Sequence, residues 1–238
     1  MPRYIPFMPF EDCFGSVGDL TFFHRDGQCF YKTRQKPAFP GTLSQMEQQS
    51  VHLRALDAWR QLDHATQMKW NRCAVGVVSH RPPFDGKSGI SGYNLFVSAY
   101  HGFAALEDEH VPKSLPWENF PPYGVEGVKS VGVEDGALLL KLSVFIDPSV
   151  EAGRYQMLAR LQLAKQGGGR DAGKMRSFLA EAPLAAGHTS ALFRLQDYVG
   201  VWNLDLPAYT VHLRHVLLDR RSGYRSQYIQ QSFDVTLP

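Results

Sequence analysis

Histidines, cysteines and short catalytic motifs are the parts of a sequence that most often do chemistry, and here they are sparse. The chain contains no Gly-x-Ser-x-Gly, no His-Glu-x-x-His and no P-loop. Cys13, Cys29 and Cys73 include no Cys-x-x-Cys pair that could anchor a zinc ion. The closest histidines, His212 and His215, are an odd number of positions apart, so on a strand they face opposite sides. We therefore predict a non-enzymatic protein with no catalytic residue, metal ion, cofactor or small-molecule substrate.

A group of basic and aromatic side chains in residues 20–36 is the stronger chemical signal. Cations bind phosphates and rings stack on unpaired bases, so such a group can contact single-stranded nucleic acid. The alternative is that the rings fill a core and the charges only face water. The net charge of +2 is smaller than expected for a dedicated nucleic-acid domain. The candidate nucleic-acid contacts are Arg25, Lys32, Arg34 and Lys36, beside Phe22, Phe23, Phe30 and Tyr31.

A β-hairpin over residues 20–32 would position these side chains. Asp26-Gly27 lies between two aromatic runs, and glycine tolerates the positive φ of a tight hairpin turn. Residues 1–19 are predicted to form an extended N-terminal arm, because their prolines interrupt helices and central strands. The arm carries Phe7 and Phe10, which we expect to be buried either on the chain's own surface or on a neighbouring subunit.

Three helices are predicted after the hairpin, and with it they form a domain over residues 20–106. Thr42 or Ser44 caps the first helix, with Glu47 three residues after Ser44 as in a capping box, and Asp63 caps the second. The first helix is expected to bury one face that contains Met46, Leu53, Leu56 and Trp59. The third carries apolar residues at helical spacing, at Tyr93, Phe96, Val97, Tyr100 and Phe103.

The hydrophobic period changes to two after a proline-rich predicted linker, residues 107–123. The clearest alternating run is Leu138, Leu140, Leu142, Val144 and Ile146. Turn residues separate several such runs, and the charges around the last turn, on Arg220, Arg221 and Arg225, are interpreted as solvated. We therefore predict an α+β multidomain protein whose C-terminal domain, residues 124–238, is an antiparallel β-sandwich of the fibronectin- or immunoglobulin-like type.

A string of positions between residues 15 and 100 resembles a family of uncharacterised proteins from Bacteroides-type bacteria and related mobile or phage-like elements. The matching positions are Gly15-Ser-Val-Gly18, Phe22-Phe-His-Arg-Asp-Gly-Gln28, Arg34-Gln-Lys-Pro37, Trp59, Trp70-Asn71 and Ser91-Gly-Tyr-Asn-Leu-Phe96. The resemblance implies a hairpin and helical region joined to a β-rich part, and a structural or assembly role. It implies no enzymatic activity and no ligand.

We predict a structural or assembly protein that self-associates through Phe7, Phe10, Phe22 and Phe30, with itself or other assembly proteins as partner. The first alternative is nucleic-acid binding by the basic hairpin. The second is a carbohydrate- or protein-binding sandwich that uses Trp202, Tyr224 or Tyr228 as an exposed platform. The N-terminus does not resemble a signal peptide and no apolar run is long enough to span a membrane, so we expect a cytoplasmic protein, or one incorporated in a particle.

Overall fold

Most of the helices and strands in the structure match those that the sequence predicts. The computed structural model describes residues 3–4, 15–25, 28–33, 41–77, 89–107, 110–135, 137–171, 173–195 and 208–236. The chain divides into two units, Met1–Met46 and Glu47–Pro238, and the division falls inside the first helix. The hairpin and most of the helical segment therefore belong to different units. The predicted domain boundaries stay predictions.

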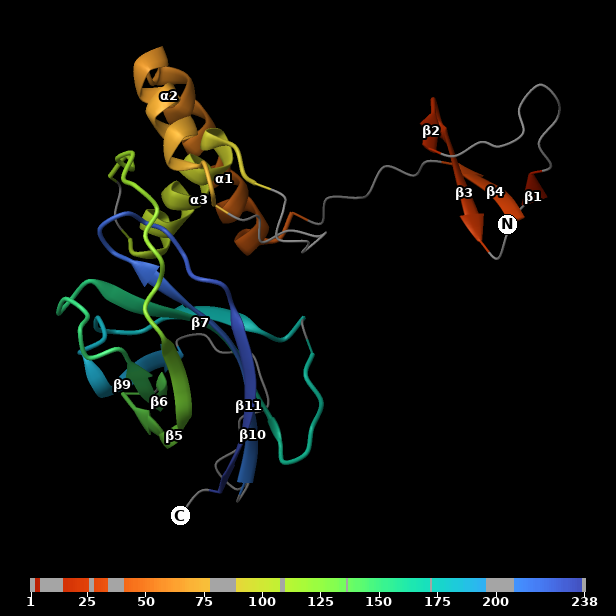
Figure 1. The fold of residues 1–238 in the computed structure, drawn as a ribbon. Coiled ribbons are helices and arrows are strands. Elements are labelled where there is room, and N and C mark those ends of the chain that lie inside the picture. The colour runs from red at the N-terminus through yellow and green to blue at the C-terminus, as the bar shows by residue number, and fades with distance from the viewer. Residues whose placement is uncertain are drawn as a thin grey trace. The chain divides into compact units, whose positions relative to one another are not determined.

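The N-terminal unit contains a small antiparallel sheet. Strands β3 (Leu20–Arg25) and β4 (Gln28–Thr33) pair along their whole length, as the sequence predicts, although the Asp-Gly turn itself lies outside the described residues. Strand β2 (Gly15–Val17) pairs with β3, and β1 (Arg3–Tyr4) pairs with β4, which gives the order β1-β4-β3-β2 (Figure 1). Both described ends of the predicted arm are thus edge strands on the chain's own hairpin.

Two antiparallel sheets enclose the main core of the second unit. One contains β5 (Tyr123–Glu134), β6 (Ala137–Ile146) and β9 (Gly187–Leu195) in the order β5-β6-β9. The other has the order β11-β10-β7-β8, from β7 (Tyr155–Lys165), β8 (Arg176–Leu179), β10 (Ala208–Asp219) and β11 (Ile229–Thr236). The alternating residues of the predicted runs point inward, so the part is β-sandwich-like as expected. Fully buried members of the core include Leu140, Leu142, Val144, Met157, Leu161, Phe193, Val211 and Leu213.

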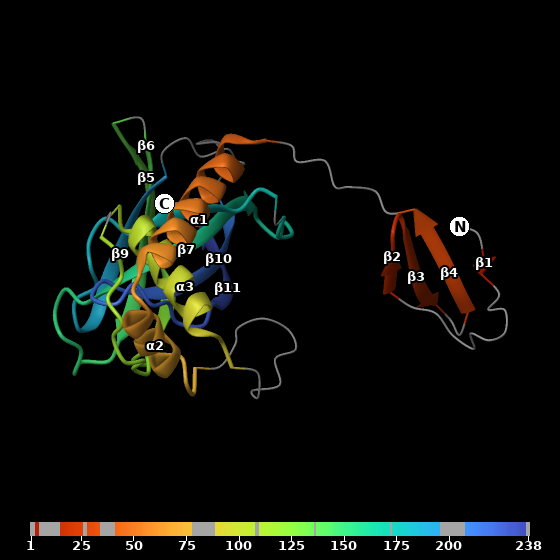
Figure 2. The same cartoon turned by 90° about the horizontal axis from the view of Figure 1, so that it is seen from above.

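Three helices lie together at the end of the sandwich where β10 and β11 join: α1 (Leu43–Gln61), α2 (His64–Cys73) and α3 (Gly92–Ala105) (Figure 2). All three match the predicted helices. Gly102 of α3 lies so close to Gly223 of the β10–β11 turn that a Cβ on Gly102 would overlap the Gly223 backbone. Gly223 also has a positive φ of 72°, which favours glycine. Two glycines thus allow helix and hairpin backbones to touch.

Helix α1 begins at the first of its two predicted caps. The backbone N–H of Gln45 donates to Oγ1 of Thr42 at 3.4 Å, and the N–H of Thr42 donates to Oε1 of Gln45 at 3.3 Å. This reciprocal pair is a capping box two residues before the predicted one, so Ser44 lies inside the helix. Asp63 occupies the N-cap position of α2, as predicted, but its side chain makes no capping hydrogen bond.

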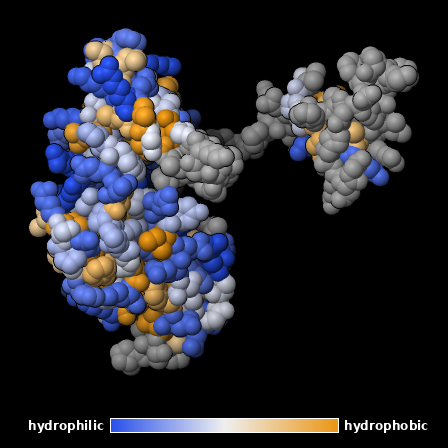
Figure 3. Space-filling view, viewed as in Figure 1, coloured by the Kyte–Doolittle hydropathy of each residue, from blue (hydrophilic) through white to orange (hydrophobic). Residues whose placement is uncertain are grey.

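The buried face of α1 differs from the predicted one. Ala55 is fully buried and Trp59 is half-buried, while Met46 is 49% and Leu53 is 51% exposed. Positions 46 and 53 lie nearly opposite position 55 on a helix of 3.6 residues per turn, so they cannot share its face. Figure 3 shows hydrophobic residues scattered among hydrophilic ones on the visible face of the second unit. None of the described helices is long and apolar enough to cross a membrane.

Candidate functional site

Two pairs of aromatic rings lie on the N-terminal sheet, one pair on each face. Phe22 is directly opposite Tyr31, with ring centroids 6.2 Å apart, and Phe23 is opposite Phe30, with centroids 5.8 Å apart. Successive strand residues point to opposite faces, so the two pairs occupy different faces of the sheet. All four rings are only half-buried. The sheet therefore presents apolar ring surface on both sides.

The sheet does not bring the predicted self-association residues together on one face. Phe22 and Phe30 fall on opposite faces, while Phe7 and Phe10 lie outside the described residues. Of the predicted basic group, Lys32 is exposed and its Nζ lies 5.8 Å from the Phe23 ring centroid. Arg25 ends β3, but its side chain is not described, and Arg34 and Lys36 lie outside the described residues.

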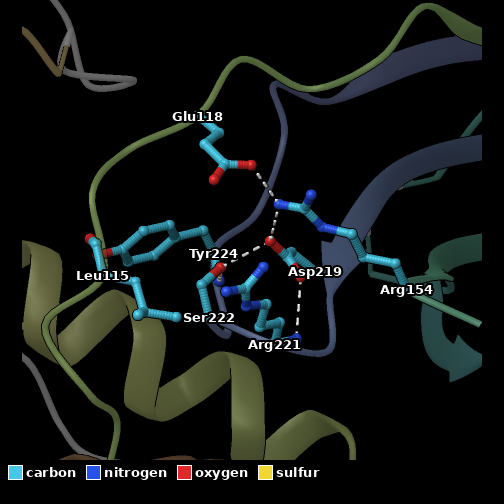
Figure 4. A network of polar contacts seen from close by, with 7 residues as sticks. All are labelled: Leu115, Glu118, Arg154, Asp219, Arg221, Ser222 and Tyr224. Carbon is cyan, nitrogen blue, oxygen red and sulfur yellow. Dashed lines mark hydrogen bonds and ion pairs between the residues drawn. The ribbon is translucent and has the colours of Figure 1, made fainter. Parts of the chain in front are cut away.

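A polar network joins three segments of the second unit that are far apart in sequence (Figure 4). Nη2 of Arg154 donates to Oε2 of Glu118 at 2.6 Å and to Oδ2 of Asp219 at 3.1 Å. Asp219 also accepts hydrogen bonds from the Ser222 hydroxyl and from the backbone N–H of Arg221. The two carboxylates, Asp219 more than Glu118, raise the pKa of the Arg154 guanidinium. The network holds the turn after β10 against the segment before β5.

Tyr224 sits at the centre of an aromatic cluster between the helices and the sandwich. Its hydroxyl donates to the Leu115 carbonyl at 2.6 Å, and its ring lies 5.2 Å from Trp117 and 6.4 Å from Trp70 between centroids. Burial raises the pKa of the Tyr224 phenol. Tyr224 is only 3% exposed, so the expectation of an exposed platform is wrong for this residue. Trp202 lies outside the described residues.

An open groove of about 590 Å³ lies beside this cluster. Tyr228 is 47% exposed on its rim, with the Arg214 guanidinium 3.7 Å from the ring centroid. The side-chain amides of Asn119 and Gln227 make no hydrogen bond within the described part of the chain. Rings and free amides are suited to binding sugars or peptide backbone. Other lining residues are Trp117, Phe120, Pro121, Pro122, Tyr123 and Ser226.

The histidines near the C-terminus have structural partners. The two ring nitrogens of His212 lie 2.8 Å from the Ser232 hydroxyl and 2.8 Å from the Gly168 carbonyl. His215 points to the opposite side, as predicted, and its Nε2 lies 3.1 Å from Oε1 of Gln231. Among the described residues, no group of three His, Cys, Asp or Glu side chains could hold a metal ion.

Sequence reasoning missed the environment of Arg225, which had been interpreted as a solvated turn charge. Its Nη2 donates to the His101 carbonyl at 2.6 Å, and its Nε is buried without a hydrogen-bond partner. The other two arginines of that group, Arg220 and Arg221, are exposed as expected. No local sequence signal marks Arg225, because the helix that covers it lies more than 100 positions earlier.

A scan against protein-family models found no matching family. A search of curated proteins likewise found no matching relative. The resemblance to the mobile-element family therefore stays a prediction, and the arguments for function rest on the sites described above.

Proposed function

We propose that this protein is a non-enzymatic structural or assembly protein that acts by self-association through its N-terminal sheet. One observation carries the proposal: of the first-unit residues whose burial the structure describes, none is buried, although β3 and β4 contribute four aromatic rings. A small sheet that no described residue covers is marginal in water. Covering these rings with a partner removes apolar surface from water and stabilises both.

A second copy of the chain is the partner that this sheet fits best. It offers the same rings and the same edge strands, so one contact satisfies both molecules. Because Phe22 and Phe30 lie on opposite faces, each chain has two contact surfaces. Two surfaces on one unit favour a ring or an extended multimer over a closed dimer. Phe7 and Phe10 would add apolar area to these contacts.

The test is the mass in solution, measured by light scattering over a range of concentrations. We expect the wild-type mass to exceed the 26.8 kDa of one chain and to rise with concentration. Phe22→Ser or Phe30→Ser alone should stop growth beyond a dimer, and the double variant should be monomeric. Leu53→Ser is the control, because it removes an exposed apolar side chain from α1. A wild-type monomer at every concentration would refute self-association.

We further infer that the sandwich is fibronectin-like. In a constant-type immunoglobulin sandwich the fourth strand joins the first, second and fifth in one sheet. Here the fourth strand, β8, pairs with the third, β7, and leaves β5, β6 and β9 as a sheet of three. This order supports the inference, and an experimental structure of the full chain tests it.

Nucleic-acid binding by the basic hairpin is the second candidate, favoured by the exposed Lys32 beside the Phe23 ring. Replacing Arg25, Lys32 and Arg34 together by Ala should then weaken binding to single strands, and added salt should weaken the wild type. Unchanged affinity of the triple variant would remove this candidate.

The groove beside Tyr228 favours a third candidate, a carbohydrate- or protein-binding module. Tyr228→Ala should then reduce binding to a glycan or peptide array.

A further inference from the structure

Arg225 and Arg154 both lie at the junction of helices and sandwich, but among the described residues only Arg154 has a counter-charge. Arg154 contacts two carboxylates, Glu118 and Asp219 (Figure 4). Among the described residues, no carboxylate lies within ion-pair distance of Arg225. Its one hydrogen bond is to the backbone carbonyl of His101, and burial lowers the pKa of its guanidinium. Within the described part of the chain, Arg225 is therefore a positive charge without a counter-charge.

The charge of this guanidinium acts on the imidazole of His101, and a second imidazole stacks on that ring. His101 of α3 stacks on His52 of α1, with ring centroids 5.9 Å apart and an angle of 29° between the planes. The titratable groups that act on the His101 ring are Arg225 and His52, and no carboxylate is among them. His52 is exposed and His101 is half-buried, so the group opens to solvent at His52. Arg225, His101 and His52 thus form a row of basic side chains from three elements, and no described carboxylate acts on the His101 ring.

A purely structural role explains only part of this arrangement. His101 lies just before the last turn of α3, and a cation that hydrogen-bonds a carbonyl near the C-terminal end of a helix is stabilised. That contact uses one guanidinium N–H, and the Nε remains buried without a partner. It also gives no reason for two imidazoles beside a cation. Burying an unpaired charge is costly, so a counter-ion here would stabilise the protein.

We propose that Arg225, His101 and His52 form a binding site for a tetrahedral oxyanion of the phosphate type. Their donors come from three separate elements, the β10–β11 turn, α3 and α1. Three separate donors suit the several oxygens of a tetrahedral dianion better than the two coplanar oxygens of a carboxylate. The site is independent of the self-association proposed above.

Binding at this site must depend on pH in one direction. Burial, the Arg225 charge and His52 all lower the pKa of the His101 imidazole in the free protein. A bound anion favours the charged imidazolium and so raises that pKa. By linkage, the protein takes up a proton on binding, and affinity rises as the pH falls through the His101 transition.

The experiment is calorimetric titration of the full chain with sulfate and inorganic phosphate at pH 6 and pH 8, at constant ionic strength. Sulfate stays a dianion at both values, so its pH dependence reports on the protein alone. Acetate tests the preference for a tetrahedral ion over a carboxylate. We expect sulfate and phosphate to bind, sulfate to bind more tightly at pH 6, and acetate to bind at least several-fold more weakly.

Variants separate the site from general attraction to a basic surface. Arg225→Gln should weaken sulfate binding about tenfold or more, because it removes a charged hydrogen-bond donor. His52→Gln changes an exposed residue, so the chain should fold, and binding at pH 6 should weaken about threefold. Arg72→Gln, an exposed arginine on α2, should change nothing. Equal weakening by His52→Gln and Arg72→Gln, or no binding at pH 6, would overturn the proposal.

Discussion

Both units of this chain contain antiparallel strands with aromatic side chains, yet among the described residues only the second unit buries them. In the sandwich, Leu140 and Phe193 are fully buried between two sheets. In the N-terminal sheet, Phe22 and Phe30 remain half-buried, and no described residue is in a core. Strand pairing alone therefore does not stabilise a unit; a covering layer does. We interpret the second unit as self-sufficient and the first as dependent on a partner.

Core truncation in the sandwich should have the largest effect. Leu140→Ala should lower the free energy of unfolding by about 2–5 kcal/mol, since it removes buried methyl groups and leaves a cavity. Urea denaturation of the full chain measures this value. The matched change Leu53→Ala affects a side chain that is 51% exposed and should cost less than about 0.5 kcal/mol. Similar losses in both variants would mean that the sandwich core is not the source of stability.

A glycine substitution should show whether helices and sandwich unfold together. Gly102→Ala places a methyl group against the Gly223 backbone, so we expect a loss of about 1–3 kcal/mol or more. Gly132→Ala is the control, because a Cβ there would meet nothing within 4 Å. If the second unit is cooperative, near- and far-ultraviolet circular dichroism of Gly102→Ala will still give coincident transitions. Separate near- and far-ultraviolet transitions would show that the helices and the sandwich unfold independently.

Acid should destabilise the second unit through His215. This side chain is fully buried and burial lowers the pKa of its imidazole from the ordinary 6.5. The unfolded chain therefore binds more protons below about pH 6.5, and stability falls as the pH drops from 6.5 through the lowered pKa. His215→Gln should flatten the dependence of unfolding free energy on pH between 8 and 5. An unchanged slope would show that His215 does not cause the loss of stability in acid. His101, whose pKa is also lowered, would contribute in the same direction.

Removing residues 1–41, most of the first unit, should have the smallest effect of all. A chain of residues 42–238 keeps the Thr42 cap of α1 and the whole core of the second unit. We expect its unfolding free energy, extrapolated to infinite dilution, to match the full chain within about 0.5 kcal/mol. The isolated chain of residues 1–41 should give the spectrum of an unfolded peptide at low concentration. A strong loss of stability in 42–238 would contradict the division into an independent and a dependent unit.

Periodicity predicted the elements well because each local signal has a local cause. Alternation in residues 138–146 predicted a strand with Leu140 and Leu142 inside, and Asp-Gly predicted the pairing of β3 with β4. The predicted buried face of α1 was wrong because the sequence allows two apolar faces, and the contacts of Trp59 with Tyr93 and Phe96 of α3 lie on only one of them. The long-range polar contacts could not be predicted for a different reason. Arg154 meets Asp219 across 65 positions, and neither residue carries a local mark of its partner.

The contacts of Trp70 have a consequence for the order in which the chain is made. Its ring packs against Tyr224, which a ribosome adds about 150 residues later. At roughly 5–20 residues per second, the α2–α3 pair waits on the order of ten seconds for the hairpin that covers it. During that interval its aromatic face is open to other nascent chains and to chaperones. Completion of the β10–β11 hairpin thus ends the part of synthesis during which this aromatic face is exposed.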